Sequence, residues 1–433
     1  MRRAWTAGLL AISLLIVLRA SPAHAGGEDK LARLLIKKGI ITAQEYAVLK
    51  REVEEAAADP QPTPQDVAEA LRDEVRQELR RPDEAAIGVT LRVEGEGRWR
   101  AHRDAGDKRS GSTSDLFLRR ASVGVEARPL DFVTARLVLT SEWLGAQTTD
   151  QGQPVDEKVT VDEGTLTLRD DGFPVYGVFG FRTQPFGAFF PRLVTDPMTQ
   201  DAYEVKKVGA TLGWKPGPWD LDLSATAYRG EEQMAHLFVS GLFDSASVLR
   251  STDAGLRAET DDVGSWILAA TLSPLKDLVA GAAFVSEPGD GRRNRTLTLW
   301  TGYTLGRATA EVEFATALSR ERYVLEGSGE RLSRSFEETM VSLGLGYNLT
   351  KPLHVAARLE RFWDGGLARA AEIWSAETRV SVGAGYTLYE QEETSARVLL
   401  EYRLTGYRRG GAARAVAAPE QGEAFAKLQI GYR

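Results

Sequence analysis

Polarity alternates from one residue to the next over most of the chain after residue 85. The segment 394–408 is an example, with apolar residues on one parity and charged residues on the other: Val398, Leu400, Tyr402 and Leu404 against Arg397, Glu401 and Arg403. A period of two is typical of a β-strand with two different faces. Lipid cannot satisfy a charged face, so we expect the charged positions to face water and the apolar positions to face lipid.

Segments with this alternation recur to the C-terminus, separated by turns that contain glycine or proline. The predicted strands are 87–103, 115–127, 131–143, 157–169, 174–184, 203–214, 219–229, 262–273, 277–286, 293–305, 307–319, 334–349, 352–363, 373–388, 394–408 and 422–432. About sixteen strands close into a barrel wide enough to hold an aqueous channel. The sequence therefore predicts an all-β fold, a 16-stranded antiparallel transmembrane β-barrel over residues 85–433.

The connections between the predicted strands alternate in length. Short ones such as 128–131 and 215–218 alternate with long ones such as 144–156 and 230–261. Bacterial outer-membrane barrels have short periplasmic turns and longer external loops, and aromatic residues at both interfaces. The sequence indicates the same arrangement, with both ends of the barrel segment in the periplasm and aromatic girdles that include Trp143, Trp214, Tyr347 and Tyr432.

One long connection, 187–203, has a special composition. It contains Pro191 and Pro197 and several bulky apolar residues. Long loops without regular structure are usually functional. We expect this loop to fold into the barrel and narrow it, with the constriction formed by Phe186, Phe189, Phe190 and Arg192.

Strand parity places many charged residues on the inner face of the barrel. The candidates for a pore-lining anion path are Arg120, Arg136, Arg182, Lys207, Arg379 and Arg403. Guanidinium groups bind oxyanions through paired hydrogen bonds, although a permeation site must also release its ion. The early basic residues would form a positive wall opposite the carboxylates of the strands 307–319 and 334–349. The alternative is a salt-bridge lattice that only keeps the barrel round. Arg182 is the strongest functional candidate because it adjoins the loop.

Two segments precede the barrel. Residues 1–25 have a basic start, an apolar run over 7–18 and an A-x-A cleavage site at 23–25, which together predict a secretory signal peptide. Residues 26–84 predict a periplasmic helical segment with a capping box at 42–45 and a proline-rich hinge. This segment is either a trimerisation or cell-wall-contacting element or a spacer without a partner.

Composition excludes several functions. The net charge of -7 suggests no nucleic-acid partner, and the absence of cysteine excludes a lipoprotein anchor. The four histidines do not converge in this topology. The sequence has no G-x-S-x-G elbow, no metal-ligand cluster and no phosphate-binding glycine loop. We therefore expect no enzyme, no catalytic residue, no metal and no cofactor.

Several motifs resemble the phosphate-selective porin O/P family. They are FLRRASVGVEA from Phe117, GFRTQPF from Gly180, VGATL from Val208 and KKGIITAQEY from Lys37. The resemblance implies a trimeric sixteen-stranded outer-membrane porin that often prefers anions, with arginines and lysines lining its pore. Two features differ from the family. The chain ends in Arg433 rather than in an aromatic residue, and its third loop has no lysine cluster. Strict phosphate selectivity is therefore not carried over.

Together these observations predict an exported bacterial outer-membrane porin for passive diffusion of small hydrophilic solutes, leaning toward anions such as phosphate. The expected partners are outer-membrane lipid, lipopolysaccharide, small-solute permeants and two further copies in a homotrimer. The alternatives are a general or organic-solute porin and a structural protein whose N-terminal helices tie the outer membrane to the cell wall.

Overall fold

A computed structural model describes residues 87–103, 110–146, 158–170, 172–233, 236–237, 241–243, 249–251, 262–289, 291–325, 330–391, 393–409 and 420–432. The predicted signal peptide 1–25 and helical segment 26–84 lie outside the described residues, and both stay predictions. No described helix has the length and apolar character needed to cross a membrane.

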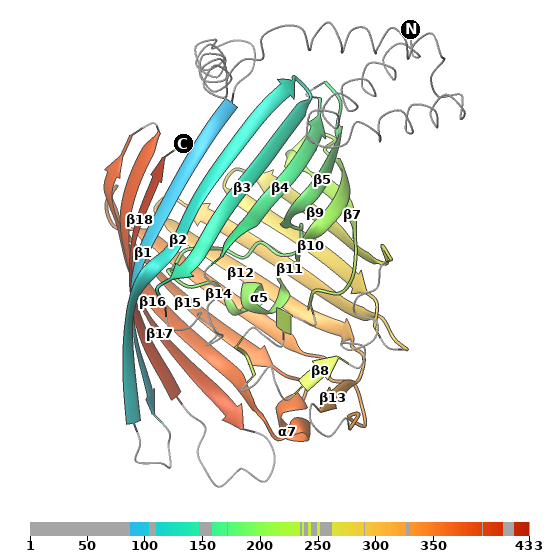
Figure 1. Cartoon of the computed structure of the whole chain (residues 1–433), viewed down its shortest axis with the longest axis vertical. Coiled ribbons are helices and arrows are strands. Elements are labelled where there is room, and N and C mark those ends of the chain that lie inside the picture. The colour runs from blue at the N-terminus through green and yellow to red at the C-terminus, as the bar shows by residue number, and fades with distance from the viewer. Residues whose placement is uncertain are drawn as a thin grey trace, which may run out of the picture. The chain divides into compact units, whose positions relative to one another are not determined.

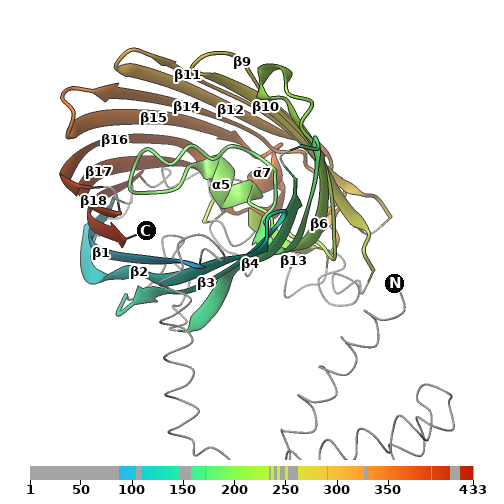
Figure 2. The same ribbon diagram turned by 90° about the horizontal axis from the view of Figure 1, so that it is seen from above.

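Sixteen of the described strands form one closed antiparallel barrel (Figures 1 and 2). They are β1 (Ile87–Arg103), β2 (Ser110–Leu130), β3 (Val133–Leu144), β4 (Val159–Arg169), β5 (Val175–Thr183), β6 (Lys206–Trp214), β7 (Asp222–Tyr228), β9 (Ser265–Leu275), β10 (Leu278–Glu287), β11 (Asn294–Leu305), β12 (Ala308–Ser319), β14 (Thr339–Asn348), β15 (Leu353–Trp363), β16 (Trp374–Glu390), β17 (Thr394–Arg409) and β18 (Glu420–Tyr432). Each strand pairs with its neighbours in sequence, and β1 pairs with β18 to close the ring. The predicted 16-stranded barrel is confirmed.

Three kinds of element were not predicted. A two-stranded ribbon is formed by β8 (Leu249–Ser251) and β13 (Tyr323–Leu325). Two short helices, α5 (Met198–Tyr203) and α7 (Leu367–Ala371), and the 3₁₀-helix η1 (Pro218–Asp220) also lie between barrel strands. In Figure 1 the ribbon and α7 lie at the same end of the barrel. This is the end with the long connections, and it is called the long-loop end below.

The outer face of the barrel is apolar, as the parity predicts. Leu212, Leu345 and Leu400 are each more than half exposed in the isolated barrel. Closure satisfies the backbone hydrogen bonds of the sheet, so this face can stand in lipid. Among the predicted girdle residues, Trp214 is exposed. Trp143 differs, because it has a positive φ of 62° and its ring stacks on that of Phe117, with ring centroids 5.5 Å apart.

The inside of the barrel has two different sides. On one side an apolar cluster fills the space between the wall and the connections that fold inward. Ile267, Val285, Met340 and Phe362 belong to this cluster from β9, β10, β14 and β15. The inner face of β9–β15 with these connections is called the packed side below. The inner face of β1–β6, which carries charged residues, is called the charged wall.

Candidate solute pathway

The connection between β5 and β6, residues 184–205, lies inside the ring of strands, and α5 is part of it (Figure 2). It contains the predicted constriction loop and is called the inward loop. Glu313 of β12 accepts hydrogen bonds from the Ala188 amide at 3.0 Å and the Thr199 hydroxyl at 2.7 Å. Glu360 of β15 accepts one from the Met198 amide at 2.6 Å. Two strands of the far wall therefore hold the loop through buried carboxylates.

The middle of the inward loop is held in the same manner. The Thr195 amide and hydroxyl both donate to the carboxylate of Glu401 on β17, each at 2.7 Å. Arg358 of β15 donates to the carbonyl oxygens of Thr195 at 3.0 Å and Asp196 at 2.9 Å. Hydrogen bonds with one ionised partner are stronger than neutral ones. The loop is thus fixed to the wall and does not hang free in the lumen.

Two ion pairs complete the attachment. Arg192 donates to Glu311 of β12 at 2.6 Å, and Arg379 of β16 donates to Asp201 at 2.8 Å. Burial raises the pKa of Asp201 to about 6, although the neighbouring Arg379 guanidinium opposes this shift. Asp201 therefore changes its charge near neutral pH, whereas the other contacts keep the loop in place.

The apolar side chains of the inward loop add packing to these polar contacts. Phe186, Met198 and Tyr203 are fully buried in the cluster on the packed side. Gly383 of β16 permits a close approach, since a Cβ atom there would lie 2.7 Å from Leu193. The loop therefore packs as a protein core does, with little free space.

The four predicted constriction residues have different surroundings. Phe186 and Phe189 are buried, while Phe190 is partly buried and lies beside Gly302 of β11. Arg192 is exposed although it is paired with Glu311. Phe190 and Arg192 therefore border open space, and Phe186 and Phe189 support the loop from within.

The charged wall consists of alternating positive and negative side chains. Arg120 pairs with Glu142, Arg136 lies 3.3 Å from Glu163, and Lys207 lies 2.7 Å from Glu232. These side chains are partly exposed, as those of a water-filled passage would be. The balance of charge agrees with a lattice that also holds the strands together, which was the alternative left open by the sequence.

Arg182 differs from the other candidates on this wall. Its guanidinium donates to the Thr211 hydroxyl at 3.0 Å, and within the described residues no ion pair joins it to a carboxylate. Arg182 lies opposite Lys207 in the β5–β6 register, directly before the inward loop begins. Two cations thus stand side by side where the loop leaves the wall.

The last two basic candidates are buried. Arg379 contacts the inward loop through Asp201. Arg403 donates to Glu423 of β18 at 2.8 Å, and Glu423 also accepts from Arg100 at 2.6 Å. Both arginines stand on the inner face, as the parity indicates, within networks of opposite charge.

Sequence reasoning missed the anchoring role of Glu313, Glu360 and Glu401. Strand parity places all three on the inner face, and only Glu313 belongs to the acidic wall that was expected opposite the basic strands. The loop itself carried the available signal. A segment without regular structure leaves backbone amides that need acceptors, and inward carboxylates on the facing strands can supply them.

No protein-family model matches the chain, and no curated protein matches its sequence. Solved structures do match its fold. The outer membrane channel DcaP of Acinetobacter baumannii matches with a TM-score of 0.54 and 12% identity, covering 80% of this chain and 98% of that chain. OmpF of Salmonella typhi, solved as a complex with daunomycin, matches with a TM-score of 0.52 and 10% identity over 80% of this chain and 98% of its own.

A third similar structure is an anion-selective porin from Comamonas acidovorans, with a TM-score of 0.51 and 11% identity over 81% of this chain and 100% of that chain. At these identities the likeness shows the fold alone. The chain has the closed sixteen-stranded barrel fold of these outer-membrane channels and porins. Membership of the phosphate-selective porin O/P family is not shown by these comparisons.

Proposed function

We propose that this protein is an outer-membrane porin through which small hydrophilic solutes diffuse passively along the charged wall. The observation that carries the proposal is the attachment of the inward loop to β12, β15, β16 and β17. On the packed side an apolar cluster fills the space where the inward loop meets the strands. The charged wall offers partly exposed charges that can replace some of a solute's hydration.

The pathway leans toward anions, and Arg182 is the residue that gives it this preference. The paired charges of the wall largely cancel, whereas Arg182 has a hydroxyl as its partner. Lys207 stands opposite it at the same level of the barrel, with its own charge paired to Glu232. A guanidinium that is held by one hydroxyl still has donors for an oxyanion such as phosphate. The similar structure from Comamonas acidovorans is an anion-selective porin, which supports the same direction.

The test is single-channel recording of the purified protein in planar bilayers. We expect a reversal potential on the chloride side in a KCl gradient, and a block of the current by added phosphate. In Arg182→Ala the block should weaken by about tenfold, the effect of losing one charge-assisted contact of about 1.4 kcal/mol. Arg307→Ala is the matched control, because Arg307 is exposed in the turn between β11 and β12.

Each result has a clear meaning for the proposal. Weak selectivity without phosphate block would favour the alternative, a general or organic-solute porin whose wall charges are structural. Complete absence of channels would sink the porin proposal. A homotrimer also remains part of the proposal, and the mass of the purified protein in detergent would test it.

The structural alternative, a tether from the outer membrane to the cell wall, depends on residues 26–84. Deleting 28–82 separates the possibilities. Detachment of the envelope with normal conductance would support the tether, and loss of trimers would assign the segment to assembly. A spacer would change neither property.

A further inference from the structure

The outer face of β9–β11 carries positive charge near the long-loop end of the barrel. Arg295 is the second residue of β11 and has the same outward parity as Leu297 and Leu299. Its side chain is exposed, and no hydrogen bond or ion pair engages its guanidinium within the described part of the chain. A charged side chain on a lipid-facing surface is costly at the bilayer midplane and is tolerated near the interface, where it can meet a polar or charged group.

Arg293 adds a second positive charge beside it. Its guanidinium donates to the Ser286 hydroxyl at 2.7 Å and to the carbonyl oxygens of Ser286 at 2.9 Å and Gly264 at 2.6 Å. Ser286 shares the outward parity of Phe284 and lies opposite Arg295 in the β10–β11 register. The two guanidinium groups therefore belong to one small area, and no carboxylate of the described residues forms an ion pair with either.

Aromatic rings lie next to these arginines. Trp266 of β9 is opposite Ser286 in the β9–β10 register and packs against Phe284, with ring centroids 5.2 Å apart. Trp266 is partly exposed on the outer face. Tryptophan prefers the level of the lipid headgroups, so this row marks the membrane interface.

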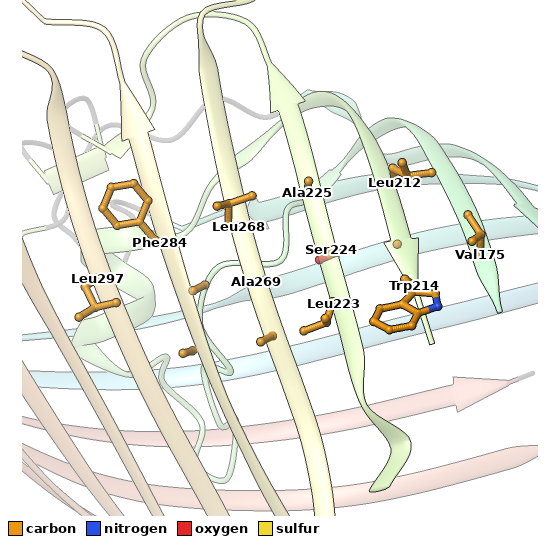
Figure 3. A pocket seen from close by; sticks show the side chains of 14 residues that line it. Val175, Leu212, Trp214, Leu223, Ser224, Ala225, Leu268, Ala269, Phe284 and Leu297 are labelled. Atoms are coloured by element: carbon orange, nitrogen blue, oxygen red, sulfur yellow. The ribbon is translucent and has the colours of Figure 1, made fainter. Parts of the chain in front are cut away.

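An apolar hollow of about 540 Å³ begins at Phe284 and extends across the outer face from β11 to β5 (Figure 3). Leu268, Phe284 and Leu297 form its edge on the side of the arginines. The hollow is deep at Ala270 and Ala282, because these small side chains lie between larger ones. The hollow has the shape and polarity to take a hydrocarbon chain.

We propose that Arg293, Arg295, Trp266 and this hollow form a binding site for a phosphate-bearing glycolipid of the outer leaflet. The phosphate lies on the two guanidinium groups, and one acyl chain fills the hollow. Arginine matches phosphate through its planar fork of donors. The inference rests on the proposed outer-membrane location, because the long-loop end of such barrels faces outward and hence meets the outer leaflet.

Charge and shape together favour this occupant over others. Free phosphate would use the arginines but would leave the hollow unexplained. A neutral lipid would use the hollow but would leave two positive charges unpaired. A lipid with a phosphate at the headgroup and acyl chains below it satisfies both.

Native mass spectrometry of the full chain in detergent tests the proposal, with bis-phosphorylated lipid A as the probe. We expect bound lipid on the wild type and a loss of affinity of at least about tenfold in the double variant Arg293→Gln/Arg295→Gln, since both charge-assisted contacts disappear. Arg307→Gln, at the opposite end of β11, is the matched control and should bind as the wild type does. Ala282→Leu, which fills the hollow, should also weaken binding.

Binding of other lipids and of a single variant identifies the ligand. Dephosphorylated lipid A should bind weakly and equally to wild type and double variant. Equal binding of bis-phosphorylated lipid A to the wild type and to Arg295→Gln would overturn the proposal. This single variant should fold, because it removes an exposed group without a partner. Phosphatidylglycerol that binds as tightly as lipid A, with the same dependence on Arg295, would overturn the assignment to a glycolipid.

The proposed function can be judged separately. Lipid binding is measured in detergent and does not need conduction. Conductance of Arg295→Gln should equal that of the wild type, because the side chain faces away from the lumen. Absence of channels in the wild type would therefore contradict the porin proposal. It would not affect the lipid proposal, which the binding measurements on the variants and the other lipids test separately.

Discussion

The two sides of the lumen use the same strand geometry for different purposes. On the packed side the inward positions of β9–β15 touch protein, and their carboxylates accept hydrogen bonds from the inward loop. On the charged wall the inward pairs Arg120–Glu142 and Arg136–Glu163 stay partly exposed. A residue that faces the inside of a wide barrel is therefore not necessarily exposed to water.

The difference has energetic consequences. A buried carboxylate that loses its hydrogen-bond partner costs the full desolvation penalty, whereas an exposed ion pair contributes little. Substitutions on the packed side should therefore act mainly on stability and on the position of the loop. Substitutions on the charged wall should act mainly on the passage of ions.

The largest effect should come from Phe186→Ala. Phe186 is fully buried between the inward loop and the packed side, so the substitution leaves a cavity. We expect a loss of about 3–5 kcal/mol in the free energy of unfolding. Urea unfolding in lipid vesicles, followed by tryptophan fluorescence, measures it. A loss below about 1 kcal/mol would show that the site collapses freely and is not packed as a core.

Glu360→Gln should have the next largest effect. The amide oxygen can still accept from the Met198 amide, but the charge facing the Arg358 guanidinium at 3.1 Å is lost. We expect a destabilisation of about 1–3 kcal/mol and a broader distribution of single-channel conductance as the loop loosens. Unchanged conductance together with unchanged stability would argue against anchoring by this carboxylate.

Arg136→Ala should change stability by less than about 1 kcal/mol, since its partner Glu163 is on a partly exposed surface. Its effect should be seen in permeation, because Glu163 then adds an uncompensated negative charge to the charged wall. The reversal potential should move toward the cation side. A large loss of stability without this movement would assign the wall charges to structure alone.

The smallest effect should come from pH. Burial raises the pKa of Asp201 to about 6, compared with an ordinary value of 3.8. Between pH 7 and pH 5 Asp201 takes up a proton, which leaves Arg379 without its counter-charge and makes the lumen more positive. The protonated form is favoured in the folded chain, so this contribution to stability is present at low pH and is lost as pH rises through about 6. Anion preference should rise slightly below pH 6.

Asp201→Asn is the control for this change. It should remove the part of the pH dependence that falls near pH 6 and should resemble the wild type at pH 5. Identical pH profiles for wild type and variant would exclude Asp201 as the titrating group.

Local patterns in the sequence predict the barrel strands and the inward loop. The packing inside the lumen depends on contacts between residues far apart in the chain, which such patterns do not contain. Alternation fixes which residues face inward, and the position of Arg182 beside the loop follows from chain order. The segment from Ser265 to Leu275 contains an indication of the packed side, because Ile267 and Leu268 make both of its faces apolar. Lipid can cover one of these faces, but the sequence does not say that the connections that fold inward cover the other.

Cysteine accessibility tests most directly whether solutes pass along the charged wall, since the chain has no cysteine of its own. Ser122→Cys places a thiol on the charged wall at β2, and Ala315→Cys places one beneath the inward loop at β12, where the native side chain is 1% exposed. Each variant is treated with an anionic thiosulfonate while single-channel current is recorded. If solutes pass along the charged wall, Ser122→Cys should be modified rapidly with a reduced current, and Ala315→Cys should not react. Rapid reaction at Ala315→Cys with none at Ser122→Cys would place the pathway on the packed side instead.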